Sequence, residues 1–370
     1  MKIPFLSFED INNTVRNEIT IAFEKVFESK WYVLGEKVEQ FEKEYASFNG
    51  VNHCVGLSNG LDALYLALKA LGVGEGDEVI VPSNTYIATL LAVSYVGAKP
   101  VLVEPNPITC NIDPSLIEEA ITSSTKAIMP VHLYGQCCEM DAIMNIARKH
   151  KLFVVEDNAQ SQGASFNGRL AGSFGDINGT SFYPGKNLGA LGDAGGATTD
   201  FAHWAERLRV LRNYGSQKKY YNEVIGHNMR LDELQAAFLS VKLKYLANWT
   251  AKRQDIAGWY DETLKDISQM KLPVVAKGAT HVYHLYVVRT ESRDQLQQYL
   301  AEKEIGSLIH YPVPPHLQQA YANLGLKKGD LPIAEDLANT CLSLPLWPGM
   351  TQSQVAFVGD TIKDFFQKKW

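Results

Sequence analysis

Short apolar runs alternate with amphipathic segments over the first half of the chain. The apolar runs predict strands at 54–57, 78–82, 100–103, 127–131 and 153–156. The amphipathic segments predict helices at 10–30, 36–48, 61–71, 85–95, 114–120 and 140–150. The strands are almost continuously apolar, as strands buried on both faces of a parallel sheet are. This alternation predicts an α/β fold, in which helices sandwich a mostly parallel sheet.

The pattern changes beyond residue 182. Residues 184–196 hold five glycines in thirteen residues, which predicts a loop and a hairpin turn after a strand at 180–183. A long helix is predicted at 230–249. From about residue 254 onward, helices and strands mix in an α+β pattern. We therefore expect a large domain at 1–253 and a smaller C-terminal α+β domain at 254–370.

Composition and charge exclude several classes of protein. The 370 residues are 46% hydrophobic and 21% charged, which is ordinary for a globular chain, and the net charge of −6 argues against nucleic acid as the main partner. The five cysteines form no CxxC pair, so no zinc site or other metal centre is expected and a reducing cytoplasm is the simplest location. Polar residues and a proline interrupt the most apolar stretch, 87–103, so no membrane span is expected.

Three sets of polar residues follow predicted strands, where ligands bind in open α/β sheets. Ser58, Asn59 and Gly60 begin a helix, where free N–H groups bind anions, although taken alone these residues are more often a simple helix N-cap. Asp157 directly follows a buried strand and needs a partner, such as a protonated ring nitrogen; a helix cap or a metal ligand is the alternative. Lys186 lies in the glycine-rich loop, where its amine could form a Schiff base with an aldehyde. The alternatives for Lys186 are a contact to a phosphate and simple exposure to solvent.

One cofactor accounts for all three sets. The residues around Gly60, together with Ser181, suit a phosphate. Asp157 suits a pyridine nitrogen, and Lys186 suits an aldehyde. The sequence therefore predicts an enzyme that uses pyridoxal 5′-phosphate (PLP).

Motifs along essentially the whole chain resemble those of the DegT/DnrJ/StrS-type sugar aminotransferases, a branch of the fold-type I PLP enzymes. The motifs, in chain order, are GEKVEQFE at 35–42, SNGLDAL at 58–64, PSNTY at 82–86, VEDNAQ at 155–160, SFYPGKNLG at 181–189, LRNYG at 211–215 and NMRLDELQAA at 228–237. Each fragment is common by itself, whereas their order is specific to the family. The resemblance implies the fold-type I architecture, with a large PLP-binding domain and a smaller C-terminal domain.

The resemblance also implies roles for individual residues. Lys186 would be the catalytic Schiff-base lysine, and Asp157 would bind the pyridine nitrogen. The other cofactor contacts would be Tyr86 on the ring, Gln160 at the 3-hydroxyl, and Asn59, Gly60 and Ser181 at the phosphate, completed by Asn228 of a neighbouring subunit. The last role implies a homodimer with shared active sites. Packing or capping is the alternative for Tyr86, Gln160 and Asn228.

A proline-rich loop at 310–316 is the candidate sugar site, because prolines fix a loop that carries two histidines and a tyrosine. The candidate substrate residues are His310, Tyr311, His316, Tyr183, Tyr221, Arg212 and Arg230. The alternative for the histidines is packing, and for the arginines exposure at the surface. His132, after the strand at 127–131, is a further candidate for the pocket floor.

Within the family, the SNG form at 58–60 and the segment 183–193 resemble the subgroup that acts at C-3 of dTDP-3-keto-6-deoxyhexoses. The expected reaction moves an amino group from L-glutamate to the dTDP-linked keto sugar, with pyridoxamine phosphate as the amine-carrying form of the cofactor. The product sugar is left open between galacto and gluco. The alternatives are a C-4 aminotransferase, a PLP-dependent dehydratase, a non-catalytic regulator that binds sugar nucleotides, and an amino-acid aminotransferase. Lys186 argues against the dehydratases, which replace this lysine with histidine.

Overall fold

The structure, a computed structural model, describes residues 1–367. Its central feature is a parallel sheet in the order β3 (Lys99–Val103), β2 (Glu78–Pro82), β4 (Thr125–Ile128) and β5 (Phe153–Val154). A second, three-stranded sheet has the order β1 (His53–Leu57), β9 (Gly195–Thr199) and β8 (Asn178–Ser181), with β9 antiparallel to both neighbours. Asp157, just beyond β5, bridges to Gly179 of β8 in parallel, and this bridge joins the two sheets into one layer.

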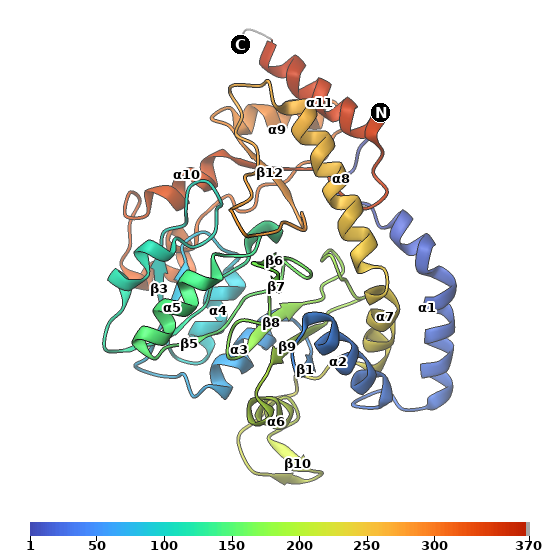
Figure 1. Cartoon of the computed structure of the whole chain (residues 1–370), viewed down its shortest axis with the longest axis vertical. Coiled ribbons are helices and arrows are strands. Elements are labelled where there is room, and N and C mark those ends of the chain that lie inside the picture. Colours follow the sequence, from blue (N-terminus) through green and yellow to red (C-terminus); the bar gives the residue numbers. More distant parts are fainter. Residues whose placement is uncertain (368–370) are drawn as a thin grey trace.

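Helices cover both faces of this layer (Figure 1). They are α2 (Glu36–Asn49), α3 (Gly60–Ala70), α4 (Ile87–Tyr95), α5 (Met140–His150), α6 (Ala202–Leu211) and α7 (Glu233–Leu243). Because successive side chains of a strand point to opposite faces, Val79 and Val81 of β2 pack with α3, α4 and α6, whereas Ile80 packs with α5. The predicted mostly parallel sheet between helices is confirmed.

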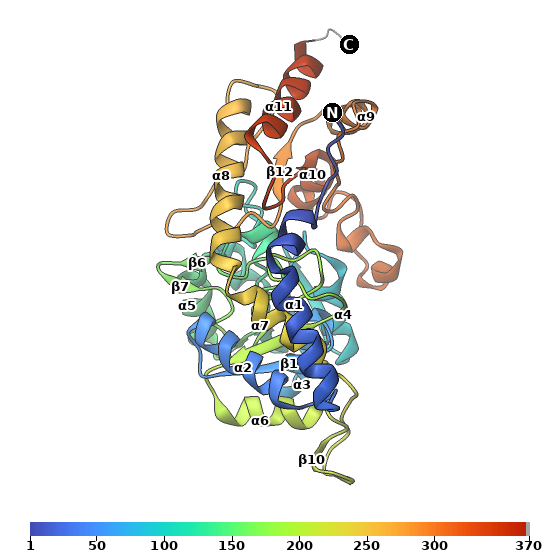
Figure 2. The ribbon, with the colours of Figure 1, turned by 90° about the vertical axis from the view of Figure 1, so that its right-hand side faces the viewer.

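The first helix, α1 (Glu9–Ser29), lies along the outside of this domain. It runs beside α7 in both views of the ribbon (Figures 1 and 2). Ile11 and Val15 are buried there in one cluster with Val241 and Trp249.

The C-terminal part has its own apolar core. It is built from α8 (Leu246–Leu264), β12 (Tyr286–Arg289), α9 (Arg293–Glu302), α10 (Pro332–Thr340), β13 (Cys341–Leu344) and α11 (Gln352–Gln367). β12 and β13 pair antiparallel, and Tyr260, Tyr286 and Val358 belong to the core between them and the helices. Ile3 from the N-terminus packs into the same core. The boundary at 253/254 falls inside α8 and stays a prediction.

The remaining strands form small hairpins. They are β6 (Ser165–Phe166), β7 (Arg169–Leu170), β10 (Ser216–Lys218) and β11 (Tyr221–Asn222). The β10–β11 hairpin projects below α6, away from the sheet (Figures 1 and 2).

Two predicted helices differ from the structure. The segment at 114–120 forms two 3₁₀ turns, Pro114–Leu116 and Glu118–Ala120, in which the N–H of Ile117 bonds to Pro114 and that of Ala120 to Ile117, three residues earlier in each case. The predicted helix at 230–249 is interrupted between α7 and α8, where the N–H of Tyr245 bonds to Lys242 instead of one residue earlier. Within residues 1–367, no helix has the length and apolar character needed to cross a membrane.

Candidate active site

The fold brings the predicted cofactor residues to one edge of the sheet. Asn59 follows β1, Tyr86 follows β2, Asp157 follows β5, and Lys186 follows β8. The carboxyl ends of parallel strands meet at the same edge, so these residues gather although they are up to 127 positions apart in the sequence (186 − 59).

Asp157 lies at the buried end of this edge, with 6% of its surface exposed. Thr89 of α4 donates a hydrogen bond of 2.9 Å to Oδ2, and the N–H of Ala159 donates one of 3.1 Å to Oδ1. Burial raises the pKa of Asp157, whereas these two donors and the nearby Lys186 ammonium oppose that rise. A carboxylate held this way is ready for a cationic ligand.

Lys186 is fixed by the backbone of its loop. Its N–H bonds to the carbonyl of Tyr183 at 2.8 Å, and the side-chain amide of Asn187 reaches the carbonyl of Val282 at 3.0 Å. Burial lowers the pKa of the Lys186 amine to about 8, and Asp157 partly opposes that shift. Among the ion pairs of residues 1–367, none includes Lys186. The amine therefore gains neutral, nucleophilic character near physiological pH.

The N-terminus of α3 forms a close backbone cradle. A Cβ at Gly60 would lie 2.6 Å from the Cβ of Ser181, and a Cβ at Gly195 would lie 2.3 Å from the backbone of Asn59. The first N–H groups of a helix have no partner within the helix, so they are free to bind an anion. The side chain of Asn59 is committed to Asp62 as the cap of α3, which leaves its backbone as its route to a phosphate.

Gln160 connects two parts of the site by hydrogen bonds. One part is the sheet edge that carries Asn59, Tyr86, Asp157 and Lys186, called here the cofactor edge, and the other is the candidate substrate loop at 310–316. Oε1 of Gln160 accepts the N–H of Tyr134 at 2.6 Å, and its Nε2 donates to the hydroxyl of Tyr311 at 3.2 Å. The Tyr311 ring lies 5.4 Å from the ring of Tyr86, centroid to centroid, and Tyr86 is 54% exposed. The structure thus places two predicted cofactor residues and one predicted substrate residue together.

His310 and Tyr183 also lie beside Lys186. The Nδ1 of His310 bonds to Ser343 at 2.8 Å, and burial, reinforced by the Lys186 charge, lowers the pKa of His310 to about 4. His310 is therefore neutral at pH 7. Tyr183 is exposed, its N–H bonds to Oγ of Ser181 at 3.3 Å, and its carbonyl holds the Lys186 backbone. Both residues remain predicted sugar contacts.

Two expected substrate residues have structural partners instead. The buried guanidinium of Arg212 pairs with Glu42 at 2.5 Å and bonds to the Gly56 carbonyl at 2.7 Å. His316 is 2% exposed, and its Nε2 bonds to Glu335 at 3.1 Å. Buried polar groups that already have partners are not free to bind a ligand. Arg212 and His316 are thus committed in part to contacts within the chain, although Nε of Arg212 and Nδ1 of His316 have no partner among the described residues, and their roles as substrate residues stay predictions.

Three further candidates lie around the β10–β11 hairpin. Asn228 is exposed and bridges to Asn213, to which Arg230 also donates at 3.0 Å. Tyr221 is 61% exposed on the hairpin itself, under the Lys218 ammonium. The hydrogen bonds and ring contacts of these three residues stay within this region, and their predicted roles stay predictions.

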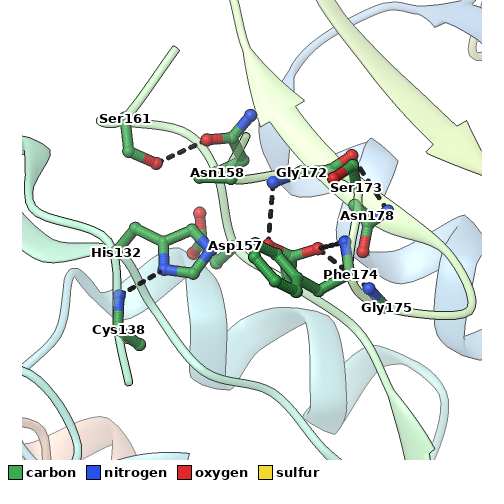
Figure 3. A network of polar contacts seen from close by, with 12 residues as sticks. His132, Cys138, Asp157, Asn158, Ser161, Gly172, Ser173, Phe174, Gly175 and Asn178 are labelled. Atoms are coloured by element: carbon green, nitrogen blue, oxygen red, sulfur yellow. Dashed lines mark hydrogen bonds and ion pairs between the residues drawn. The ribbon is translucent and has the colours of Figure 1, made fainter. Parts of the chain in front are cut away.

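Glu156, next to Asp157, is the centre of a buried network. Figure 3 labels the residues that bond to it, which are His132, Gly172, Phe174 and Gly175. The Glu156 carboxylate accepts the N–H groups of Gly172, Phe174 and Gly175 at 2.6–2.9 Å and the Nε2 of His132 at 2.7 Å. The N–H of Cys138 donates to Nδ1 of His132 at 3.1 Å. Both ring nitrogens of His132 are thus engaged and its side chain is fully buried, so it supports the strand ends and does not line a pocket.

Sequence reasoning missed Thr89 and Tyr134. Thr89 is a fully buried hydroxyl in the mostly apolar helix α4, and a polar residue on such a face was the available signal. Tyr134 bonds to Gln160 through its N–H and to the His310 carbonyl through its hydroxyl. Its backbone φ is +60°. No local pattern marks a tyrosine in that role.

These residues fit the predicted cofactor. The glycine cradle beside Ser181 leaves backbone N–H groups for a phosphate, the buried Asp157 lacks a cationic hydrogen-bond partner, and the Lys186 amine has a lowered pKa. The exposed Tyr86 ring offers a flat face at the same edge. Among residues 1–367, no three histidine, cysteine or acidic side chains gather as ligands for a metal ion.

Comparisons with known proteins identify one family. Residues 13–363 match the DegT/DnrJ/EryC1/StrS aminotransferase family. The dTDP-3-amino-3,6-dideoxy-alpha-D-galactopyranose transaminase of Aneurinibacillus thermoaerophilus is 53% identical over 98% of this chain and 99% of its own length.

Two solved structures share the fold. DesV of S. venezuelae, solved in complex with a ketimine intermediate, superposes with a TM-score of 0.98 at 46% identity, over 100% of each chain. NtdA of Bacillus subtilis, solved with the cofactor PMP bound, gives a TM-score of 0.91 at 34% identity, over 98% of this chain and 85% of its own.

Proposed function

Because this chain belongs to the DegT/DnrJ/EryC1/StrS aminotransferase family, we propose that it transfers the amino group of L-glutamate to C-3 of a dTDP-linked 3-keto-6-deoxyhexose. The products are 2-oxoglutarate and a dTDP-3-amino-3,6-dideoxyhexose. The observation that carries the proposal is the Lys186 amine, with its lowered pKa, beside the buried carboxylate of Asp157. A dehydratase or a non-catalytic sensor does not require this pair.

The enzyme is a PLP-dependent aminotransferase. When bound, PLP supplies an electrophilic aldehyde and a ring that withdraws electrons from the carbon attached to the amine. We assign Gly60, Ser181 and the backbone of Asn59 to its phosphate, Tyr86 to its ring and Gln160 to its 3-hydroxyl. Asn228 of the second subunit completes this set.

Lys186 has two tasks in the proposal. Its neutral amine anchors the cofactor, and after release Nζ removes the proton from Cα of glutamate. Nζ would then pass this proton to the cofactor, and in the second half of the reaction Nζ would move a proton from the cofactor to C-3 of the sugar. A positioned acid–base group of this kind contributes about 10²–10⁴-fold to the rate. A pKa of about 8 lets Lys186 act in both directions near neutral pH.

Asp157 supplies a fixed negative charge at the protonated ring nitrogen. In the low-dielectric site, this charge stabilises the positive ring more strongly than it would in water. Thr89 and the N–H of Ala159 orient the carboxylate, so little reorganisation is needed during the reaction.

We assign the sugar to the exposed side of Lys186. Tyr183, His310 and Tyr311 border this position, and a neutral His310 donates or accepts a hydrogen bond without adding charge. Tyr221 and Arg230 of a second subunit would complete the nucleotide end, which makes the enzyme a homodimer with shared active sites. The 53% identity to the galactopyranose transaminase supports a galacto sugar over a gluco one.

The C-terminal arginines distinguish this chain from amino-acid aminotransferases, which bind the carboxylate of the substrate with a C-terminal arginine. Beyond residue 253 the arginines are Arg289 and Arg293. Arg289 pairs with Asp336 at 2.5 Å, and Arg293 binds Asp294 at 2.5 Å and the Ala338 carbonyl at 2.8 Å. Neither arginine is free for a substrate.

We also propose a cytoplasmic location, which the free cysteines at five positions support.

The testing experiment follows the absorbance of the PLP-loaded enzyme through both half-reactions. L-glutamate should convert the visible band to the near-ultraviolet band of pyridoxamine phosphate, and a dTDP-3-keto-6-deoxyhexose should restore the visible band. The galacto and gluco keto sugars are added separately, and the faster one identifies the substrate. Failure of glutamate to bleach the band refutes the donor, whereas failure of both sugars to restore it refutes the acceptor.

A further inference from the structure

Helix α10 of the C-terminal domain is capped by a side chain from the large domain. Glu104 directly follows β3, and its two carboxylate oxygens accept the N–H of Ile333 at 2.7 Å and the N–H of Ala334 at 3.0 Å. The local N-cap position is Leu331, which offers no side-chain acceptor. The first turn of α10 thus takes its acceptor from across the domain boundary, where a carboxylate also complements the helix dipole.

The same carboxylate holds the loop that carries Tyr86. Ser83, three residues before Tyr86, donates from Oγ to Oε2 of Glu104 at 2.9 Å. Ser83 is completely buried, so this bond fixes the start of the loop. Glu104 therefore links the loop that presents the Tyr86 ring to the N-terminus of α10.

Helix α10 in turn holds the candidate substrate loop. Glu335 of α10 accepts Nε2 of His316 at 3.1 Å, at the end of the 310–316 loop. Tyr311, Pro314 and Pro315 of this loop line one small cavity together with Ala334, Leu337 and Ala338 of α10. This contact explains why His316 is buried and bonded although its sequence context resembles a binding loop.

These contacts form a closed circuit around the sugar position. The circuit runs from Tyr86 through Ser83, Glu104 and α10 to the 310–316 loop, and it returns to Tyr86 through the ring of Tyr311, 5.4 Å away. A second tie supports it, because Arg289 pairs with Asp336 of α10 at 2.5 Å and also bonds to the Pro107 carbonyl, close to Glu104 in the chain.

We propose that Glu104 is a positioning residue for the sugar half of the reaction. It holds α10, and through α10 the 310–316 loop, at the distance from Tyr86 that the keto sugar requires. Glutamate needs Lys186 and the cofactor edge, whereas the sugar also needs the loop. Loss of Glu104 should therefore affect the two half-reactions unequally. This inference rests on the proposed function, since it assigns the sugar to that loop.

The test compares Glu104→Ala with a matched control, Glu78→Ala. Glu78 lies at the opposite end of the same sheet, where it accepts from Thr122 and Lys99. In Glu104→Ala, KM for the keto sugar should rise by about ten-fold, because three hydrogen bonds to a charged acceptor are lost. The rate of bleaching by glutamate should change much less, because the N–H of Ser83 keeps its 2.9 Å bond to the Val103 carbonyl and still holds the Tyr86 loop. Amide hydrogen exchange should accelerate at 333–334 and in the 310–316 loop. The control should change none of these quantities.

A second variant keeps the proposal testable if Glu104→Ala folds poorly. Glu335→Gln weakens the hold on His316 farther along the circuit, and it should show the same unequal effect, with a higher KM for the sugar and an unchanged glutamate step. Equal losses in both half-reactions, or an unchanged KM, would overturn the positioning role. If the wild-type enzyme itself fails to aminate the keto sugar, the proposed function fails first, and the exchange measurement alone then decides whether Glu104 caps α10.

Discussion

The hydroxyl of Thr89 donates a 2.9 Å hydrogen bond to Oδ2 of Asp157, from the first turn of α4 to the end of the central sheet. Both groups are buried, and Thr85 extends the chain of hydroxyls at 2.9 Å from Thr89. This bond opposes the rise in the pKa of Asp157 that burial causes.

Thr89→Val should weaken cofactor binding, because valine has the shape of threonine without its hydroxyl. Hydrogen bonds to charged groups contribute about 1.5–3 kcal/mol, so the dissociation constant of PLP should rise by about ten-fold or more. The loss also raises the pKa of Asp157, which moves the acid limb of PLP binding to higher pH. Absorbance titration with PLP at several pH values measures both effects.

Thr89→Ser is the matched control, because it keeps the hydroxyl and removes only a methyl group. It should bind PLP as the wild type does. Equal affinity in all three proteins would show that Thr89 does not orient Asp157.

The pKa of Lys186 predicts how fast the enzyme without cofactor takes up PLP. Only the neutral amine attacks the aldehyde, and the pKa is lowered from 10.5 to about 8. The rate constant should therefore rise about ten-fold per pH unit below pH 8 and level off above it. Stopped-flow absorbance from pH 6 to 10 measures this profile.

Two substitutions test that assignment. Asp157→Asn removes the charge that supports the ammonium form of Lys186, so the plateau should begin at lower pH. Lys186→Ala should keep its far-ultraviolet circular dichroism but form no covalent link to PLP and catalyse no transamination. A wild-type rate that levels off only near pH 10 would contradict a lowered pKa.

The cofactor edge could be predicted from the sequence because each of its residues follows a strand. Asp157 comes directly after an apolar run, and Lys186 lies in a glycine-rich loop after another, so the rule that strand ends meet at one edge was sufficient. The family resemblance is confirmed by the match over residues 13–363. The resemblance assigned roles to individual residues, which their positions after strands alone could not do.

The contacts that could not be predicted join side chains that lie far apart in the sequence. Arg212 pairs with Glu42, 170 positions earlier, and nothing near Arg212 indicates that it is buried. His316 shows a different limit, since its partner Glu335 belongs to a helix that only tertiary packing brings to the loop. Asn228 was assigned to a neighbouring subunit, which a single chain does not test.

Glu156→Gln should destabilise the fold more than it alters the chemistry. Glu156 is completely buried and accepts from His132 and three backbone N–H groups, and a glutamine would turn its amide N–H₂ toward one of these donors. Leaving one buried donor without an acceptor costs about 1–3 kcal/mol, so the free energy of unfolding in urea should fall by about that amount.

The control for this variant is Glu118→Gln at the surface. Glu118 binds Lys149 and His150 in solvent, where ion pairs contribute little, so stability should stay near that of the wild type. Equal stability of Glu156→Gln and the wild type would mean that the network in Figure 3 is not needed to hold the strand ends.

The backbone cradle predicts an effect that depends on the phosphate of the cofactor. A Cβ at Gly195 would lie 2.3 Å from the backbone of Asn59, so Gly195→Ala must push the start of α3 away from Ser181. Overpacking of this kind costs about 1–3 kcal/mol. The affinity for PLP should fall by about ten-fold or more, whereas the weaker affinity for pyridoxal, which lacks the phosphate, should change little. Paired absorbance titrations with the two compounds measure the ratio.

Gly258→Ala provides the contrast, because it makes the same chemical change where the structure has room. Gly258 lies within α8, and no atom stands within 4 Å of a Cβ placed there. Alanine favours the helix over glycine by about 0.5–1 kcal/mol, so this variant should be more stable and bind both compounds as the wild type does. If Gly195→Ala instead lowered the affinities for PLP and pyridoxal equally, the damage would reach the ring or Lys186, and the N-terminus of α3 would not be the phosphate site.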